Sequence, residues 1–190
     1  PNSENDFGNN IIPNLLRDNR KMYAHRFSGY WKDVGTISSL WEANMEVLDP
    51  ENSGINLFDD EWKVYSRNSG MNGHKIGENA VVENSSISEG CEIEGNVDYS
   101  VISSNVIIEE GADIRYSVIM PGVTIKKGAK VYYSIVAENA VIDEDAHIGV
   151  IPEELENPED WGIAVIGAGA KITKGAKVDP GVMIKSGEEV

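Results

Sequence analysis

Residues 29–36, which read GYWKDVGT, place a carboxylate, a cation and two aromatic rings next to one another. Asp33 stands two residues before Gly35, so it suits either a tight turn or a divalent metal ion, for which carboxylate oxygens are common ligands. Tyr30 and Trp31 either pack against neighbouring residues or line a binding site. The residue types alone leave both pairs of alternatives open.

Other groups that could do chemistry are isolated from one another. Cys91 is the single cysteine, which excludes an intrachain disulfide and a metal site built from several cysteines. His147 lies at an outward-facing position of a repeated segment, where it could act as a base, but we expect a solvated surface histidine. His25 and His74 have no partner motif.

Two groups of lysines recur at comparable positions of the repeated segment. Because acidic residues are abundant around them, we expect ladders of surface ion pairs, with a site for an anion as the alternative. The lysines are Lys126, Lys127 and Lys130 in one group and Lys171, Lys174 and Lys177 in the other.

These residues are set in a chain that repeats itself. Residues 99–115, 116–132 and 133–149 form three units of 17 residues, each beginning with Tyr-Ser, and aliphatic residues recur within each unit at spacings of 6, 6 and 5. A fixed short period is typical of a solenoid, and this one indicates the hexapeptide form of a parallel β-helix. We therefore expect an inward ladder made by Ile108, Ile125 and Ile142.

The period extends beyond the three units in both directions. It begins at Ile76 and continues without a slip from Ile166 to Val190, so the predicted β-helix occupies residues 76–190. Residues 150–165 interrupt it with prolines and a cluster of acidic residues. We interpret them as a loop inserted into the solenoid.

Composition narrows the possible partners. The chain has 190 residues and a formal net charge of −16, and residues 76–190 hold 21 acidic against 8 basic residues. Such a solenoid repels nucleic acid and anionic membranes, so we expect neither as a partner. The sequence has no apolar run long enough to span a membrane and no signal-peptide pattern, and a cytoplasmic protein is expected.

The first 75 residues contain too few elements to bury a sheet of their own. We expect a helix over residues 10–18, a strand over 21–27 and a second helix that carries a capping box of Ser39 and Glu42. That helix should stop at Asp49–Pro50. Residues 51–75 read as a linker with a strand near 62–65. The segment before the linker resembles the end of a larger domain.

Three stretches carry a resemblance to a known family. DFGNNIIPNLL, YWKDVGT and ISSLWEANMEVL, followed by the hexapeptide repeat, closely resemble the bacterial ADP-glucose pyrophosphorylases, also called glucose-1-phosphate adenylyltransferases. The resemblance implies a mainly β fold, in which a left-handed parallel β-helix follows the C-terminal remnant of an α/β nucleotidyltransferase domain at residues 1–50. It covers nearly the whole chain.

The resemblance also implies an activity and its residues. In this family ATP and glucose 1-phosphate give ADP-glucose and pyrophosphate for glycogen synthesis. By resemblance Asp33 is catalytic and holds Mg²⁺, Tyr30 and Trp31 contact substrate, and Lys75 and Arg67 bind a sugar-phosphate effector. A homo-oligomer is expected, and the resemblance implies a tetramer. The family's Gly-rich nucleotide loop and sugar-phosphate lysine are not in this sequence, so we expect the chain alone to be inactive.

Two other functions remain open from the sequence. A non-catalytic regulatory subunit of the same family would assemble without turnover, although it would not need an intact Trp31–Thr36 motif. A hexapeptide acyltransferase would use His147 as a base in a cleft between solenoids, and no motif around His147 supports that function.

Overall fold

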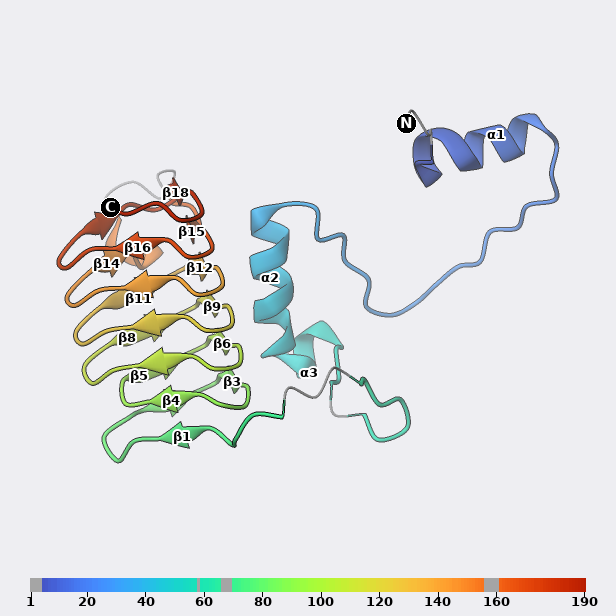
Figure 1. Cartoon of the computed structure of the whole chain (residues 1–190). Coiled ribbons are helices and arrows are strands. Elements are labelled where there is room, and N and C mark those ends of the chain that lie inside the picture. The colour runs from blue at the N-terminus through green and yellow to red at the C-terminus, as the bar shows by residue number, and fades with distance from the viewer. Residues whose placement is uncertain (1–4, 58, 66–69, 156–160) are drawn as a thin grey trace.

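The computed structural model of the chain describes residues 5–57, 59–65, 70–155 and 161–190. Its main body is a parallel β-solenoid in which short strands follow one another around each turn (Figure 1). The strands form three parallel sheets of six strands each, and every sheet takes each third strand of the chain. The predicted hexapeptide β-solenoid is therefore confirmed.

Each sheet is described by its strands in order along the solenoid. The first sheet contains β1 (Lys75–Ile76), β4 (Glu92–Ile93), β7 (Ile107–Ile108), β10 (Thr124–Ile125), β13 (Val141–Ile142) and β16 (Lys171–Ile172). The second contains β2 (Val82–Glu83), β5 (Asn96–Asp98), β8 (Asp113–Arg115), β11 (Lys130–Tyr132), β14 (His147–Ile148) and β17 (Lys177–Val178). The third contains β3 (Ser86–Ile87), β6 (Val101–Ile102), β9 (Val118–Ile119), β12 (Ser134–Val136), β15 (Ala164–Ile166) and β18 (Met183–Ile184).

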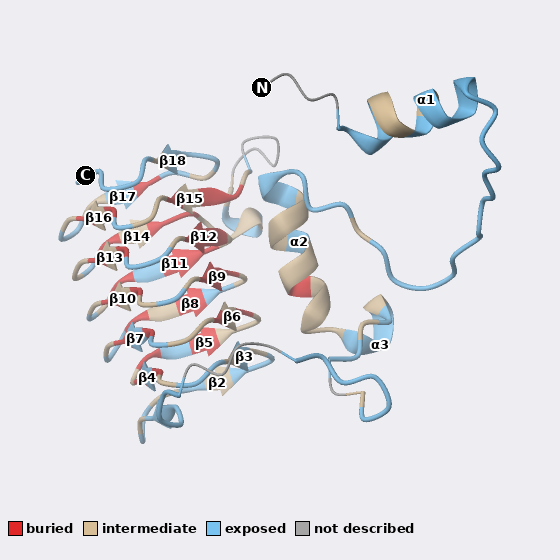
Figure 2. Cartoon of the chain, turned by 45° about the vertical axis from the view of Figure 1, so that its right-hand side comes forward, coloured by how far each residue is buried: buried red, intermediate tan, exposed pale blue. Residues whose placement is uncertain are grey.

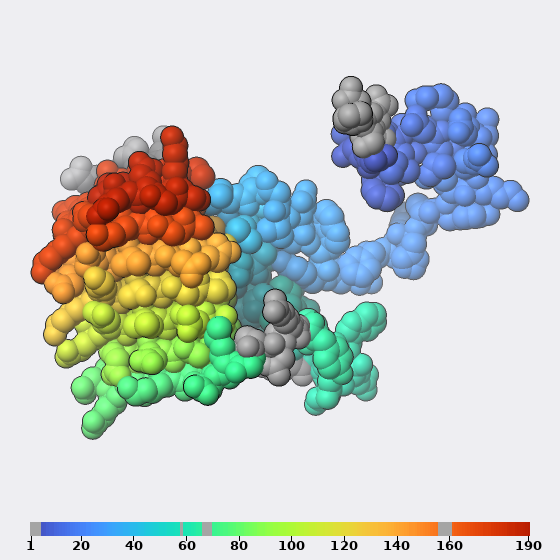
Figure 3. Space-filling view, in the orientation of Figure 1, coloured from blue at the N-terminus to red at the C-terminus, as the bar shows by residue number. Residues whose placement is uncertain are grey.

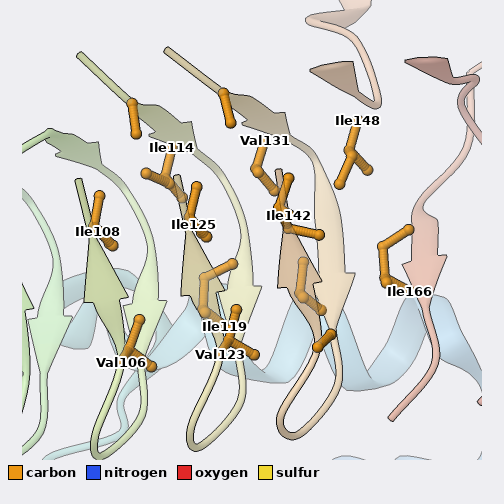
Figure 4. Packing of buried hydrophobic residues seen from close by; sticks show 14 of the residues in the cluster. Val106, Ile108, Ile114, Ile119, Val123, Ile125, Val131, Ile142, Ile148 and Ile166 are labelled. Atoms are coloured by element: carbon orange, nitrogen blue, oxygen red, sulfur yellow. The ribbon is translucent and has the colours of Figure 1, made fainter. Parts of the chain in front are cut away.

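The interior of the solenoid is a stack of aliphatic side chains in register. Ile125 pairs with Ile108 on one neighbouring strand and with Ile142 on the other, and all three are fully buried (Figure 4). Equivalent ladders from the other two sheets meet them in the centre. One turn cannot bury this face alone, so each turn depends on the turns above and below it.

One corner of the solenoid is built from the Tyr-Ser pairs that begin each unit. Tyr99, Tyr116 and Tyr133 have positive φ angles of 44–48°, a conformation that L-residues rarely adopt. Their rings stack at centroid distances of 5.0 and 4.8 Å. The serines that follow are fully buried, and Ser117 Oγ accepts from the Ser134 N–H, as Ser100 Oγ accepts from the Ser117 N–H. Stacking and hydrogen bonds thus stabilise the strained corner.

Helix α2 (Ile37–Val47) lies along the outer face of the third sheet (Figure 2). Met45 is buried against Val118 and Ile135 of that sheet, and Trp41 Nε1 donates a hydrogen bond of 2.7 Å to the Tyr116 carbonyl. The helix begins earlier than predicted, because Thr36 is the N-cap and forms the capping box with Ser39. The predicted box of Ser39 with Glu42 is wrong.

The other helices are short. A π-helical turn, η1 (Phe7–Ile11), leads into α1 (Ile12–Arg17), which agrees with the helix expected there. Helix α2 is followed by α3 (Pro50–Ser53), for which Asp49 is the N-cap, so Pro50 ends one helix and begins another. None of the helices in the described ranges is long and apolar enough to cross a membrane.

Two predicted strands are absent from the structure. Residues 21–27 and 62–65, all of them described, form no strand, and most of their side chains are exposed. A strand needs a neighbouring edge that accepts its backbone hydrogen bonds, and neither segment has one. Residues 19–36 instead form an extended connection. It places α1 at a distance from the solenoid (Figure 3).

The chain leaves the solenoid after β14 and returns at β15. It makes a 3₁₀ turn, η2 (Pro152–Glu154), on the way out. On its return, the Trp161 ring lies 6.2 Å from Trp41 and 5.9 Å from Tyr133, both in edge-on contact. The returning segment therefore covers the place where Trp41, near the middle of α2, packs against Tyr133.

Candidate functional site

The Asp33 carboxylate is exposed, and in the described part of the chain it has no partner. It lies on the connection just before the N-cap of α2. Among the residues that the structure describes, no hydrogen bond or ion pair occupies its oxygens, although the cationic Lys32 is its neighbour in sequence and makes two ion pairs elsewhere. Asp33 is thus an acidic group whose oxygens remain available to a ligand.

The residues on either side of Trp31 are fixed to α2. Tyr30 Oη donates a 2.6 Å hydrogen bond to Glu46 Oε2, and Lys32 Nζ lies 2.7 Å from Glu46 Oε1 and 2.8 Å from Glu42 Oε2. We call these four residues, Tyr30, Lys32, Glu42 and Glu46, the Glu46 clamp. Trp31 is 77% exposed, so its ring does not pack in the core.

The clamp shifts the pKa values of Tyr30, Lys32 and Glu46 in the directions that preserve it. The hydrogen bonds from Lys32 and then Tyr30 lower the pKa of Glu46, and the bond to Glu46 raises the pKa of Tyr30. The bonds to Glu42 and Glu46 raise the pKa of Lys32 to about 12. The clamp is therefore charged and intact across the neutral range.

These shifts predict how the clamp responds to acid. Because the pKa of Glu46 is lower in the folded chain, its contribution is present above the ordinary value of 4.5 and is lost as pH falls through the lowered value. We expect NMR titration of the Glu46 carboxyl to give a midpoint below 4.5. In Lys32→Met the midpoint should rise, and an unchanged midpoint would contradict the ion pair.

A metal ion at Asp33 would need further ligands. Within the described ranges, no group of three or more His, Cys, Asp or Glu side chains is placed to hold a metal. Mg²⁺ usually takes only one or two carboxylates and completes its shell with phosphate oxygens and water. A single free carboxylate fits one position of such a shell.

Of the two predicted effector residues, only Lys75 is described, and it lies on the first strand of the solenoid. Lys75 is on β1, and its ammonium group pairs with Glu94 at 3.1 Å, which raises its pKa. Its side chain remains largely exposed. Arg67 lies outside the described residues.

His147 is less exposed than expected. It points outward from β14, but its Nε2 is buried and has no partner among the described residues. Its ring contacts Tyr132 edge-on at a centroid distance of 5.5 Å. Burial, followed by the nearby Lys130 and Lys177, lowers its pKa. We expected a solvated histidine, and this is wrong for Nε2 of His147, which is buried.

Most of the recurring lysines form ion pairs, as expected. Lys126, Lys127, Lys171 and Lys174 contact carboxylates at 2.6–3.1 Å. Lys130 and Lys177 form no ion pair with any of the residues that the structure describes. They lie on the neighbouring strands on either side of His147 in the second sheet.

Comparison with protein families divides the chain into two parts. Residues 1–50 match the family described as nucleotidyl transferase, and residues 71–158 match the family described as GlmU-like, C-terminal hexapeptide. The first match contains Asp33, the clamp and all of α2. The second contains most of the solenoid.

One curated relative is similar to this chain over both parts. A glucose-1-phosphate adenylyltransferase of Acetivibrio thermocellus is 39% identical over 188 residues, which is 96% of this chain and 43% of that protein. The chain is a homologue of glucose-1-phosphate adenylyltransferases. It matches the C-terminal part of these adenylyltransferases and spans less than half of their length.

Two further glucose-1-phosphate adenylyltransferases are similar over a shorter region. That of Clostridium acetobutylicum is 55% identical over 106 residues, or 56% of this chain and 28% of the relative. That of Bacillus thuringiensis is 51% identical over 112 residues, or 59% of this chain and 30% of the relative. The family resemblance that the sequence indicated is thus confirmed.

Sequence reasoning found Asp33 but missed the residues that hold its segment. Glu42 and Glu46 are four residues apart on α2 and therefore share a face of the helix, next to its apolar stripe. The sequence offered one indication of the clamp: two acids at this spacing on a helix that follows a lysine in the YWKDVGT motif. Nothing in the sequence showed that the lysine would fold back onto that face.

Proposed function

We propose that this chain acts as part of an adenylyltransferase that makes ADP-glucose and pyrophosphate from ATP and glucose 1-phosphate. The observation that carries the proposal is the free carboxylate of Asp33, presented beside a clamped segment in the part of the chain that matches nucleotidyl transferases. The relatives described above are glucose-1-phosphate adenylyltransferases. We propose that the ADP-glucose is used for glycogen synthesis in the cytoplasm.

Asp33 is the residue of this chain that we propose as a Mg²⁺ ligand. When bound, Mg²⁺ neutralises the charge that builds on phosphate oxygens during nucleotidyl transfer. The chain's own part is to hold the carboxylate in place through the clamp. Trp31 and Tyr30 flank the site and are the proposed sugar-side contacts, with the Tyr30 hydroxyl engaged by Glu46.

Exposed apolar residues in residues 5–36 support a role as part of a larger nucleotidyltransferase domain. Phe7 is 71% exposed, Leu16 60% and Phe27 67%, and all three lie outside the solenoid core. Exposed apolar side chains that gather into a patch mark a surface of contact with other protein. We propose that they pack on the rest of a nucleotidyltransferase domain.

For the solenoid we propose a role in assembly and regulation. Its open ends and outer faces are suited to contacts between subunits, and we propose a homotetramer. Lys75, together with Arg67, is the proposed site for a sugar-phosphate effector, in which case the effector would compete with Glu94 for the Lys75 ammonium group.

A fusion protein tests the proposed activity. The fusion places this chain after the part of the Acetivibrio thermocellus relative that precedes the region of similarity. We expect it to form ADP-glucose from ATP and glucose 1-phosphate in the presence of Mg²⁺. A folded, assembled fusion without this activity would favour the regulatory subunit, and acetyl transfer from acetyl-CoA would favour an acyltransferase.

A further inference from the structure

Glu46 is the one residue of the clamp that contacts both flanks of Trp31. Its carboxylate accepts from Tyr30 Oη through one oxygen and from Lys32 Nζ through the other, at 2.6 and 2.7 Å. Glu42 contacts Lys32 alone. The position of the Asp33 segment relative to α2 therefore depends on Glu46 more than on any other side chain of the clamp.

Helix α2 gives Glu46 a fixed position. The preceding residue, Met45, is 7% exposed and lies in the apolar contact with the third sheet. One turn earlier, Trp41 is fixed by the hydrogen bond of its indole nitrogen to the Tyr116 carbonyl. Because α2 is held by the solenoid at these two points, Glu46 connects the rigid solenoid to the segment that carries Asp33.

The clamp also determines which way Asp33 faces. In an extended segment, side chains two residues apart share a side and successive side chains alternate. Tyr30 and Lys32 both turn toward α2, and the Lys32 side chain is only 20% exposed. Trp31 and Asp33 are exposed, as expected if they occupy the opposite side.

We infer that Glu46 is a positioning residue, which holds Tyr30 and Lys32 against α2 so that the Asp33 carboxylate faces away from the helix and toward its metal ion. The inference rests on the proposed function for the metal ion, but the orientation of the segment is a property of this chain alone. The contacts of Glu46 join one short segment to one helix, so the expected role of Glu46 is local.

Backbone dynamics of the chain itself test the positioning without any catalytic assay. In Glu46→Ala we expect the NMR order parameters of the amides of residues 30–35 to fall below those of the parent, while those of the solenoid strands stay unchanged. Glu51→Ala removes an exposed acid of α3 that has no side-chain partner among the described residues, and it should match the parent. Unchanged order parameters over residues 30–35 in Glu46→Ala would overturn the inference.

The fusion tests the consequence for the metal. We expect Glu46→Ala to raise the Mg²⁺ concentration for half-maximal ADP-glucose formation by about 10- to 100-fold, the usual effect of losing a group that orients a metal ligand. In a Tyr30→Phe/Lys32→Met background, Glu46→Ala should add nothing further, because Glu46 acts through these two residues.

The two tests separate failure of this inference from failure of the proposed function. An active fusion whose Mg²⁺ requirement is unaffected by Glu46→Ala would overturn the inference and leave the activity standing. An inactive parent fusion would contradict the activity, and the order parameters of residues 30–35 would then decide the positioning role by themselves.

Discussion

Asp33→Asn is expected to lower the rate of ADP-glucose formation by the fusion on the order of 10³-fold. The change removes one negative charge and one strong oxygen ligand while it keeps the size of the side chain. Asp33 is exposed and has no partner among the described residues, so its replacement breaks no contact within the chain. We therefore expect the melting temperature to stay that of the parent.

The control is an aspartate far from the site. Asp179→Asn changes an exposed residue of the solenoid and should leave both the rate and the melting temperature unchanged. High Mg²⁺ should restore part of the activity of Asp33→Asn if the loss is one of metal binding. Near-normal turnover of Asp33→Asn at low Mg²⁺ would remove Asp33 from the metal site.

Ile125→Ala should have the largest effect on stability. Ile125 is fully buried in β10, between Ile108 and Ile142, with complete turns on both sides. Deleting its side chain removes buried apolar surface and leaves a cavity that the stacked turns cannot close. We expect a loss of about 2–5 kcal/mol in the free energy of unfolding, measured by urea denaturation.

Lys127→Ala is the matched control two residues further on. The Lys127 side chain is 66% exposed, and its ammonium group pairs with Glu110 at 3.0 Å on the surface. Such a pair contributes little to stability, so the urea midpoint should not move measurably. Equal effects of Ile125→Ala and Lys127→Ala would contradict the inward register of the ladder.

The solenoid was predictable because its information is local and repeated. An aliphatic residue at every sixth position has one way to be buried, which is to stack on its equivalents in the turns above and below. The tyrosines marked the units in the sequence, but their positive φ angles and their contact with α2 depend on the folded corner. The period of a repeated residue does not show which other parts of the fold that residue contacts.

The segment before the solenoid was less predictable, because its local patterns fit more than one structure. Alternation over residues 21–27 indicated a strand, yet a strand also requires a partner edge. Thr36 with Ser39 and Ser39 with Glu42 are both possible helix starts, and the structure uses the first. Glu42 instead pairs with Lys32, a contact between residues ten apart that no local rule predicts.

The candidate site was predicted in part for the same reason. Asp33 and its flanking aromatic residues were found from a contiguous motif, and the structure leaves the carboxylate of Asp33 free. The clamp joins that motif to acids on the next helix, and its geometry is set by the packing of α2 on the solenoid. Residues brought together by such packing are visible only in the structure.

The most direct measurement is the position of the metal ion in the fusion. Crystals grown with a non-hydrolysable ATP analogue and Mn²⁺ as a stand-in for Mg²⁺ locate the ion by its anomalous scattering. The account predicts a peak about 2.1 Å from a carboxylate oxygen of Asp33, as for a directly bound ion of this kind. A nucleotide-bound ion whose ligands do not include Asp33 would contradict it.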